Sequence, residues 1–97
     1  MATYICLMKL TKQGIKDIKN APSRIETARK GIEASGGKLV AMYSVMGEYD
    51  YVAVVEYSSD EAGMAFLMTL GSMGNVRTTT LKAFTEKEFA NIVKKMP

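Results

Sequence analysis

The chain has 97 residues, of which 47% are hydrophobic and 24% charged, and its formal net charge is +3 at pH 7. This length suits one domain over residues 1–97, and the composition excludes a chain that stays disordered. There is no histidine and one cysteine, Cys6, which excludes the usual haem ligand, the commonest zinc ligand and every histidine-based catalytic triad. We therefore expect no metal and no cofactor.

The distribution of charged and apolar residues bears on location and partners. The lysines are spread along the chain without a basic block, so we expect no direct binding to nucleic acid. The densest positive stretch, residues 12–19, has helical spacing and indicates a solvated face, with an anionic partner site as the alternative. A charged leader and a run of about 18 apolar residues are both absent, and Cys6 lies in an apolar run. These features predict a cytoplasmic protein without a membrane segment.

The first predicted element is a strand over residues 4–10, where a nearly continuous apolar run indicates burial on both faces and a central place in a sheet. Thr11 can cap a short turn, and Pro22 stands at a favourable first position of the helix that follows. Gly36 and Gly37 end that helix, because glycine adopts the left-handed conformation at low cost.

Two strands are predicted next, over residues 39–45 and 51–57. The short connection between them contains Gly47 and indicates a β-hairpin. The stretch from Ser58 to Glu61 then has the spacing of a capping box, which predicts a helix through residue 70.

The last predicted elements are a threonine-rich strand over residues 76–84 and a short amphipathic helix, which a second capping-box pattern from Thr85 to Glu88 begins. The order is therefore β-α-β-β-α-β with an added C-terminal helix. This order predicts an α+β fold of the ferredoxin-like kind, in which helices cover one face of an antiparallel sheet.

Both faces of the predicted sheet are apolar. In the first strand Tyr4 and Cys6 point to one face, while Ile5 and Leu7 point to the other. A face in water would instead alternate with polar residues, and an apolar patch of this size is unusual on a monomer. We therefore expect a second copy of the chain, or alternatively the last helix, to cover the second face, and we favour a homodimer or higher homo-oligomer.

A set of short motifs resembles those of the GYD domain family. The set comprises the Gly-Glu-Tyr-Asp sequence of residues 47–50, the start at residues 4–7, and the stretches 12–15, 59–61, 70–78 and 83–86. The resemblance covers nearly the whole chain. It implies a ferredoxin-like fold that forms a dimeric α/β barrel, and it assigns no activity.

Two motifs also resemble the effector-binding domain of the leucine-responsive regulators. They are the Gly-x-Tyr-Asp sequence at the hairpin and the Val-Arg-x-Thr-x-Thr sequence of the last strand. That family binds amino acids near its subunit interfaces, so the resemblance implies a candidate ligand-contacting set: Gly47, Tyr49, Asp50, Thr78 and Thr80. The chain has no segment for the helix-turn-helix domain of those regulators, so any role on DNA would need a partner chain.

Each candidate residue also has a structural interpretation. Asp50, beside Tyr43, Tyr49 and Tyr51, can orient a ligand amine or act as a general base, or it can accept backbone N–H bonds that fix the hairpin. The threonines of the last strand can offer hydroxyls to a ligand or simply favour a strand. Arg77 can clamp a carboxylate or extend from an edge strand into solvent, and the eight methionines can line a pocket or fill the core.

Three functions remain open on the sequence. The leading hypothesis is a homo-oligomer that binds a small organic molecule, without catalysis, through Tyr43 and the motif residues named above. The second is a cofactor-free monooxygenase or isomerase of the dimeric α/β-barrel type, in which Asp50 and a tyrosine would move protons. The third is a structural interaction module without a pocket.

Overall fold

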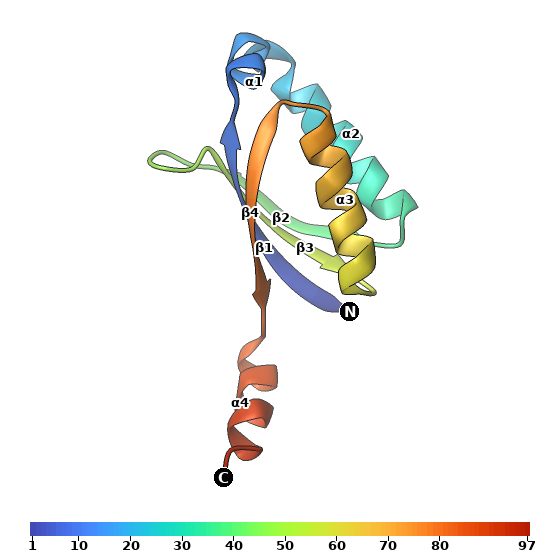
Figure 1. The fold of residues 1–97 in the computed structure, drawn as a ribbon, viewed down its shortest axis with the longest axis vertical. Helices are drawn as coiled ribbons and strands as arrows, with labels where there is room; N and C mark the ends of the chain where they lie inside the picture. The colour runs from blue at the N-terminus through green and yellow to red at the C-terminus, as the bar shows by residue number, and fades with distance from the viewer.

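The computed structural model describes residues 1–97 and contains four strands, four α-helices and one short 3₁₀ turn (Figure 1). In chain order these are β1 (Ala2–Leu10), α1 (Lys12–Lys16), η1 (Ile18–Asn20), α2 (Ala21–Ala34), β2 (Lys38–Ser44), β3 (Tyr51–Tyr57), α3 (Asp60–Ser72), β4 (Val76–Ala83) and α4 (Glu86–Lys94). None of the helices is long and apolar enough to cross a membrane.

The strands form one antiparallel sheet in the order β2-β3-β1-β4. The apolar strand β1 lies in the interior of this sheet, with Cys6 opposite Ala53 of β3 on one side and Thr80 of β4 on the other. Figure 1 shows α2 and α3 on the same face of the sheet. The predicted α+β, ferredoxin-like fold is therefore confirmed.

The turn and cap residues act as the sequence indicates, with one difference. Gly36 and Gly47 have φ values of 86° and 120°, in the left-handed region that favours glycine. The predicted capping box at Ser58 is wrong, because the N-cap of α3 is Ser59, whose hydroxyl accepts the N–H of Ala62 at 3.2 Å. The helix starts one residue later than the pattern suggests, and Asp60 becomes its first residue with its carboxylate free to bond elsewhere.

The core lies between the sheet and the two helices α2 and α3. Its buried members come from alternate positions of β1 and β3 and from one turn of α2: Tyr4, Cys6, Met8, Ile32, Tyr51, Ala53, Val55 and Tyr57. Tyr57 is only 1% exposed, and its ring lies 5.9 Å, centre to centre, from the ring of Phe66 of α3. We call this side of the sheet the covered face.

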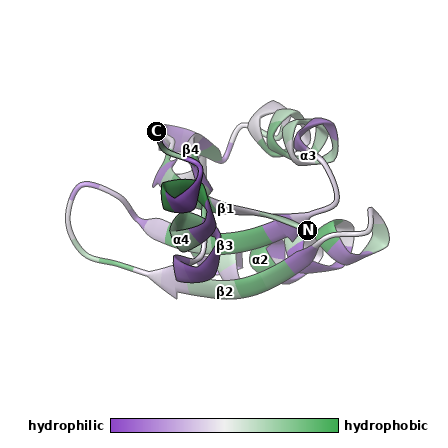
Figure 2. Ribbon diagram, turned by 90° about the horizontal axis from the view of Figure 1, so that it is seen from below, coloured by the Kyte–Doolittle hydropathy of each residue, from purple (hydrophilic) through white to green (hydrophobic).

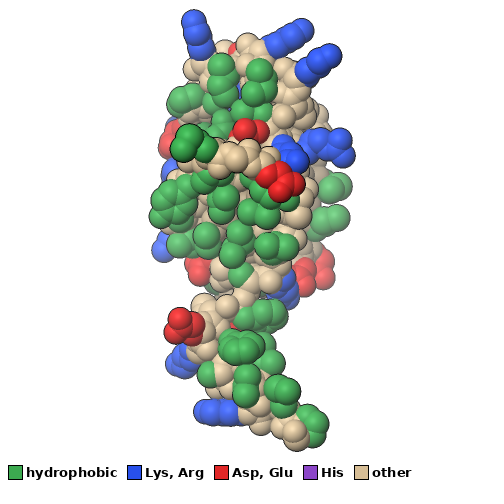
Figure 3. All heavy atoms as spheres, turned by 90° about the vertical axis from the view of Figure 1, so that its left-hand side faces the viewer, with side chains coloured by type: hydrophobic (Ala, Val, Ile, Leu, Met, Phe, Trp, Pro, Cys, Tyr) green, Lys and Arg blue, Asp and Glu red, His purple; other side chains and the backbone are tan.

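The opposite side, which we call the open face, is apolar and uncovered. Ile5 lies between Val54 of β3 and Leu81 of β4 on this face, and Leu81 is 49% exposed. Figure 3 shows apolar side chains gathered over this face. The alternative that the last helix covers it is wrong within one chain, because α4 continues beyond the end of β4, away from the sheet (Figures 1 and 3).

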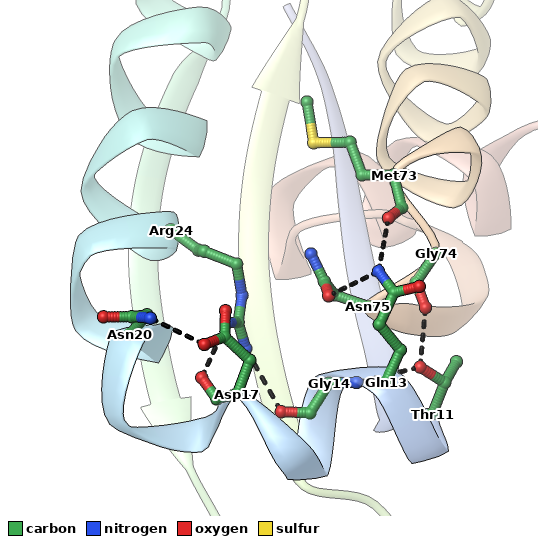
Figure 4. Close-up of polar contacts among 9 residues, drawn as sticks. All are labelled: Thr11, Gln13, Gly14, Asp17, Asn20, Arg24, Met73, Gly74 and Asn75. Atoms are coloured by element: carbon green, nitrogen blue, oxygen red, sulfur yellow. Dashed lines mark hydrogen bonds and ion pairs between the residues drawn. The ribbon is translucent and has the colours of Figure 1, made fainter.

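Two motifs of the resemblance, 60 residues apart, meet at one end of the molecule (Figure 4). The Thr11 hydroxyl donates to the carbonyl of Gly74 at 2.6 Å, and the Gln13 amide donates to the side-chain oxygen of Asn75 at 3.0 Å. Gly14 is required here, because a Cβ on it would lie 2.2 Å from the carbonyl oxygen of Asn75. These contacts fasten α1 to the loop between α3 and β4.

Candidate functional site

A cavity of about 350 Å³ opens on the covered face, between α3 and the strands β1 and β4. Its walls are mostly apolar, from Cys6 and Val55 in the sheet to Met64 and Leu67 on α3. One end of the cavity differs, because Tyr4, Asp60 and Lys82 bring a hydroxyl, a carboxylate and an ammonium group to it. We call these three residues the polar end of the cavity.

The polar end is assembled from three separate elements. Tyr4 of β1 and Lys82 of β4 are opposite one another in the sheet, which places both side chains on the covered face. Asp60 reaches them from the first turn of α3. The hydroxyl of Tyr4 donates a hydrogen bond to Asp60, and Nζ of Lys82 lies 3.1 and 3.2 Å from its two carboxylate oxygens.

These contacts set the charge of each group. The carboxylate of Asp60 accepts the Tyr4 hydroxyl and, together with burial, raises the pKa of Tyr4 to about 12. The hydrogen bonds from Tyr4 and Lys82 lower the pKa of Asp60 below its ordinary value. At neutral pH the polar end therefore presents a neutral hydroxyl donor, a carboxylate and an ammonium group.

Small groups lie beside Tyr4 in the wall of the cavity. A Cβ on Gly63 would lie 3.5 Å from the Tyr4 ring, which is an ordinary van der Waals distance. Thr80 donates to the sulfur of Cys6 across 3.7 Å, and burial raises the pKa of that thiol. The thiol is thus neutral, and the floor of the cavity carries no charge.

A second and larger cavity, of about 540 Å³, lies between α2 and α3 above the same strands. Four residues line both cavities: Cys6, Val55, Tyr57 and Phe66. The rings of Tyr57 and Phe66 therefore stand between the two. The methionines Met8, Met42 and Met73 line that second space.

The predicted hairpin residues lie at a different place. The carboxylate of Asp50 accepts the backbone N–H of Leu10 at 2.8 Å, and the backbone N–H of Asp50 donates to the carbonyl of Met8 at 2.9 Å. The Nζ atom of Lys9 lies 5.4 Å from the centre of the Tyr49 ring. These contacts tie the loop that Gly47 turns to the end of β1.

The remaining predicted residues are divided between the two faces of the sheet. Tyr43 is opposite Val52 on the open face and is 63% exposed. Thr78 and Thr80 are opposite Met8 and Cys6, which places them on the covered face. Within one chain the structure brings Thr80 to the cavity, and it does not bring the predicted set together.

A comparison with known protein families shows to which family the chain belongs. The family described as "GYD domain" matches residues 4–93. The chain belongs to the GYD domain family. A curated relative from Thermus thermophilus is 37% identical over 84 residues, which are 86% of this chain and 88% of the relative, and it is named "Glutamine synthetase and cystathionine beta-lyase binding protein".

Solved structures share the fold of this GYD domain. A feast or famine regulatory protein from M. tuberculosis, complexed with L-methionine, superposes with a TM-score of 0.66 at 24% identity over 88% of this chain. The leucine response regulatory protein of Mycobacterium tuberculosis gives 0.65 at 26% identity over 87%. This GYD domain spans about half of these regulator chains, 51% in each case. A protein from Thermus thermophilus gives a TM-score of 0.57 at 26% identity, covering 88% of this chain and 95% of that protein.

The polar end of the GYD domain's cavity is what sequence reasoning missed. Asp60 stands inside a capping pattern, where a carboxylate is explained by the helix terminus alone. Tyr4 and Lys82 are 78 positions apart in the chain and become neighbours only through the register of β1 with β4. A usable signal was the single lysine at a covered-face position of a threonine-rich strand.

The donor set of this GYD domain suits organic ligands. Histidine, cysteine, aspartate and glutamate side chains do not come together anywhere in groups of three or more that could hold a metal ion. The polar end has one carboxylate, one ammonium and one hydroxyl, which are the groups that recognise a polar or zwitterionic part of a small molecule.

Proposed function

We propose that this chain is a homo-oligomeric binding module that holds a small amphipathic molecule between α3 and the sheet, without catalysis of its own. The observation that carries the proposal is the cavity of about 350 Å³ whose apolar walls end at Tyr4, Asp60 and Lys82. A ligand with an apolar body and a zwitterionic end, such as an α-amino acid, matches both parts of this cavity.

The polar end supports this ligand class through its charges. The ion pair of Asp60 with Lys82 is at the surface, with side-chain exposures of 60% and 49%, so opening it costs little. A ligand ammonium can then bind Asp60 while a ligand carboxylate binds Lys82. The Tyr4 hydroxyl, which stays protonated far above neutral pH, holds Asp60 in place during this exchange.

Two comparisons are consistent with binding. The regulator of the same fold was solved with L-methionine, which has the size and the two charges that the polar end would recognise. The relative at 37% identity is named as a binding protein.

The test is an NMR titration of the protein with L-methionine and L-phenylalanine, with N-acetyl-L-methionine amide, which lacks both charges, as the comparison probe. We expect shifts of the methyl signal of Met64 with the two amino acids and at least tenfold weaker binding of the uncharged probe. In Asp60→Asn and Lys82→Met the affinity for both amino acids should fall about tenfold or more, because each variant removes one charged partner.

Matched controls come from the exposed side of α2. Glu33→Gln and Lys30→Met make the same changes of charge at exposed positions outside both cavities, and we expect binding to be unchanged. Saturable binding that is unchanged in Asp60→Asn and Lys82→Met would mean that the ligand binds elsewhere. No shift at Met64 with either amino acid would favour a structural module without a ligand.

The predicted residues at the hairpin between β2 and β3 form a second candidate binding site for the same molecule. Tyr43 faces the open side of the sheet, so Gly47, Tyr49 and Asp50 can join it around a ligand only when a second copy supplies the rest of the pocket. If Tyr43→Ala weakens binding of the amino acids and Thr80→Val does not, the ligand binds at the subunit interface. The opposite result favours the cavity under α3.

Binding of another protein is a second proposed function, and the name of the 37% identical relative is the observation that favours it. The test is size-exclusion chromatography of this chain mixed with purified glutamine synthetase from the organism that encodes this chain. Co-elution at micromolar concentration supports this function. Separate elution, with and without L-methionine present, contradicts it for that enzyme.

A further inference from the structure

The larger cavity has no part in the function proposed above. It has a volume of about 540 Å³ and lies between α2 and α3 over the sheet, and 19 of the 26 residues that line it are hydrophobic. Figure 2 shows hydrophobic residues on β2 and β3 and a mixture of hydrophobic and hydrophilic residues in both helices. Sites for small molecules in proteins have volumes of about 300–1,000 Å³, so this cavity is large enough to hold one.

This cavity stays accessible when the chain self-associates. Its floor consists of buried side chains on the covered face of the sheet, among them Val55, which is 2% exposed. A second copy is expected on the open face, which is the other side of the sheet. Pairing of two sheets therefore leaves the space between α2 and α3 free for a ligand.

The charge in the cavity wall is already balanced. Arg24 is the one charged residue that lines the cavity. Its Nη1 atom lies 2.8 Å from a carboxylate oxygen of Asp17 and 2.8 Å from the carbonyl oxygen of the same residue (Figure 4). A ligand carboxylate would have to compete with Asp17 and would lose its water among apolar walls, which is costly. The cavity therefore favours an uncharged ligand.

Three hydroxyl groups of the cavity wall are also engaged within the chain. Thr27 and Thr69 each donate to the carbonyl of the residue four positions earlier in the same helix, at 3.1 and 2.9 Å. The hydroxyl of Ser35 lies 3.0 Å from the carbonyl oxygen of Gly31 and 3.2 Å from the hydroxyl of Tyr57. These groups have little hydrogen-bonding capacity left for a ligand.

Tyr51 differs from these residues. It lines the same cavity and is only 8% exposed, yet its hydroxyl forms no hydrogen bond with another group of the chain. The other two core tyrosines, Tyr4 and Tyr57, share hydrogen bonds with neighbouring side chains. No fully enclosed side-chain nitrogen or oxygen lacks a partner, so the Tyr51 hydroxyl is open to the space that it lines. A nine-tenths buried hydroxyl without a partner is a specific donor for a ligand.

We propose that the cavity between α2 and α3 is a second binding site, for an uncharged and mostly apolar molecule that carries one carbonyl group. The apolar body lies among side chains such as Met8, Ile32 and Met42, and thioethers adapt to ligands of irregular shape. The Tyr51 hydroxyl donates to the carbonyl oxygen. This site is independent of the cavity under α3, where the polar end is suited to charged groups.

The test is an NMR titration of the full-length protein with 2-decanone, and with decanoate, which has the same chain length and a negative charge, as the comparison probe. We expect saturable shifts of the methyl signals of Met8 and Met42, which line only this cavity, without a shift of Met64, which lines only the other one. Decanoate should bind about tenfold or more weakly, because its charge has no free partner.

Three results of this titration would overturn the proposal. They are the absence of saturable shifts at Met8 and Met42, equal or tighter binding of decanoate, and shifts that depend on the protein concentration instead of on 2-decanone. In the last case a segment of another chain would fill the space between α2 and α3.

Two pairs of variants locate the bound molecule. Ala28→Phe places a ring in the cavity and should weaken binding of 2-decanone about tenfold or more, whereas Ala34→Phe makes the same change at an exposed position of α2 outside both cavities and should leave binding unaltered. Tyr51→Phe should weaken binding about fivefold, because one hydrogen bond is lost. Tyr57→Phe removes a hydroxyl that already bonds Ser35 and should change the affinity by less than about twofold. Full affinity in Ala28→Phe or in Tyr51→Phe would contradict the proposal, and circular dichroism confirms that each variant is folded.

Discussion

The two faces of the sheet have nearly the same apolar character but very different surroundings. On the covered face Tyr57 and Val55 are 1% and 2% exposed, because α2 and α3 pack over them. On the open face Leu81 and Tyr43 are 49% and 63% exposed. The difference shows that the sheet has more apolar surface than the helices of the same chain can cover. The uncovered part, the open face, is where we expect another subunit to bind.

The largest expected effect on stability comes from shortening one apolar side chain on each face of the sheet. Ile32→Ala, in the covered core, should lower the free energy of unfolding by about 2–5 kcal/mol, because the 2% exposed side chain leaves a cavity. Ile5→Ala, on the open face, should cost less in the monomer. Urea unfolding at several protein concentrations measures both. We expect the cost of Ile5→Ala to grow with concentration and that of Ile32→Ala to stay constant. A concentration-independent cost for both would contradict the assignment of the open face to an interface.

Two glycines test how tightly the helical side is packed. Gly14→Ala should destabilise the fold by about 1–3 kcal/mol, because its Cβ would lie 2.2 Å from the Asn75 carbonyl oxygen. Gly31→Ala, in the middle of α2 with open space around it, should raise stability by about 0.5–1 kcal/mol through the higher helix propensity of alanine. Thermal unfolding monitored by circular dichroism gives both values. Equal effects of the two changes would mean that α1 does not pack against the start of β4 in solution.

The polar end of the cavity has a pH dependence that the open face lacks. The pKa of Tyr4 is raised to about 12 from 10.0, so the folded state holds this proton more tightly than the unfolded state. The resulting stabilisation is complete below pH 10 and is lost as the pH rises through about 12. We expect the stability difference between the unaltered chain and Tyr4→Phe to be constant from about pH 7 to 10 and to decline above it. Urea unfolding at each pH measures this difference.

A control keeps this experiment specific to Tyr4. Tyr43→Phe removes a hydroxyl from an exposed side chain on the open face, and its stability difference should not change with pH. A declining difference in both variants would assign the effect to a general response of the fold to alkali.

The smallest effect is expected at the junction of β4 with α4. Thr85→Ala removes the cap of α4 and should weaken that helix by about 1 kcal/mol. Because every residue of α4 is exposed in the single chain, global unfolding of the monomer should change by only about a few tenths of a kcal/mol. Hydrogen exchange of the α4 amides at low protein concentration measures the local effect. In contrast, Thr11→Ala removes a cap whose hydroxyl also bonds Gly74, so there the global stability should fall.

Much of this fold follows from local signals that act over a few residues. The apolar run of β1, the left-handed glycines Gly36 and Gly47, and the capping box at Thr85 each specify their conformation through neighbouring atoms, and the structure confirms them. The N-cap of α3 differs from the predicted one because Ser58 and Ser59 are adjacent and equally suited to cap a helix. Only the geometry of the chain leaving β3 decides between them.

The sequence by itself determined the order of elements, the apolar character of both sheet faces, and the motifs of the GYD domain family. The tertiary structure decided which face the helices cover, that α4 projects past the sheet, and that Tyr4, Asp60 and Lys82 meet at one end of a cavity. The physical reason is range. Caps, turns and side-chain alternation depend on residues a few positions apart, whereas the cavity depends on the register of β1 with β4 and on the position of α3, which form only when the whole chain packs.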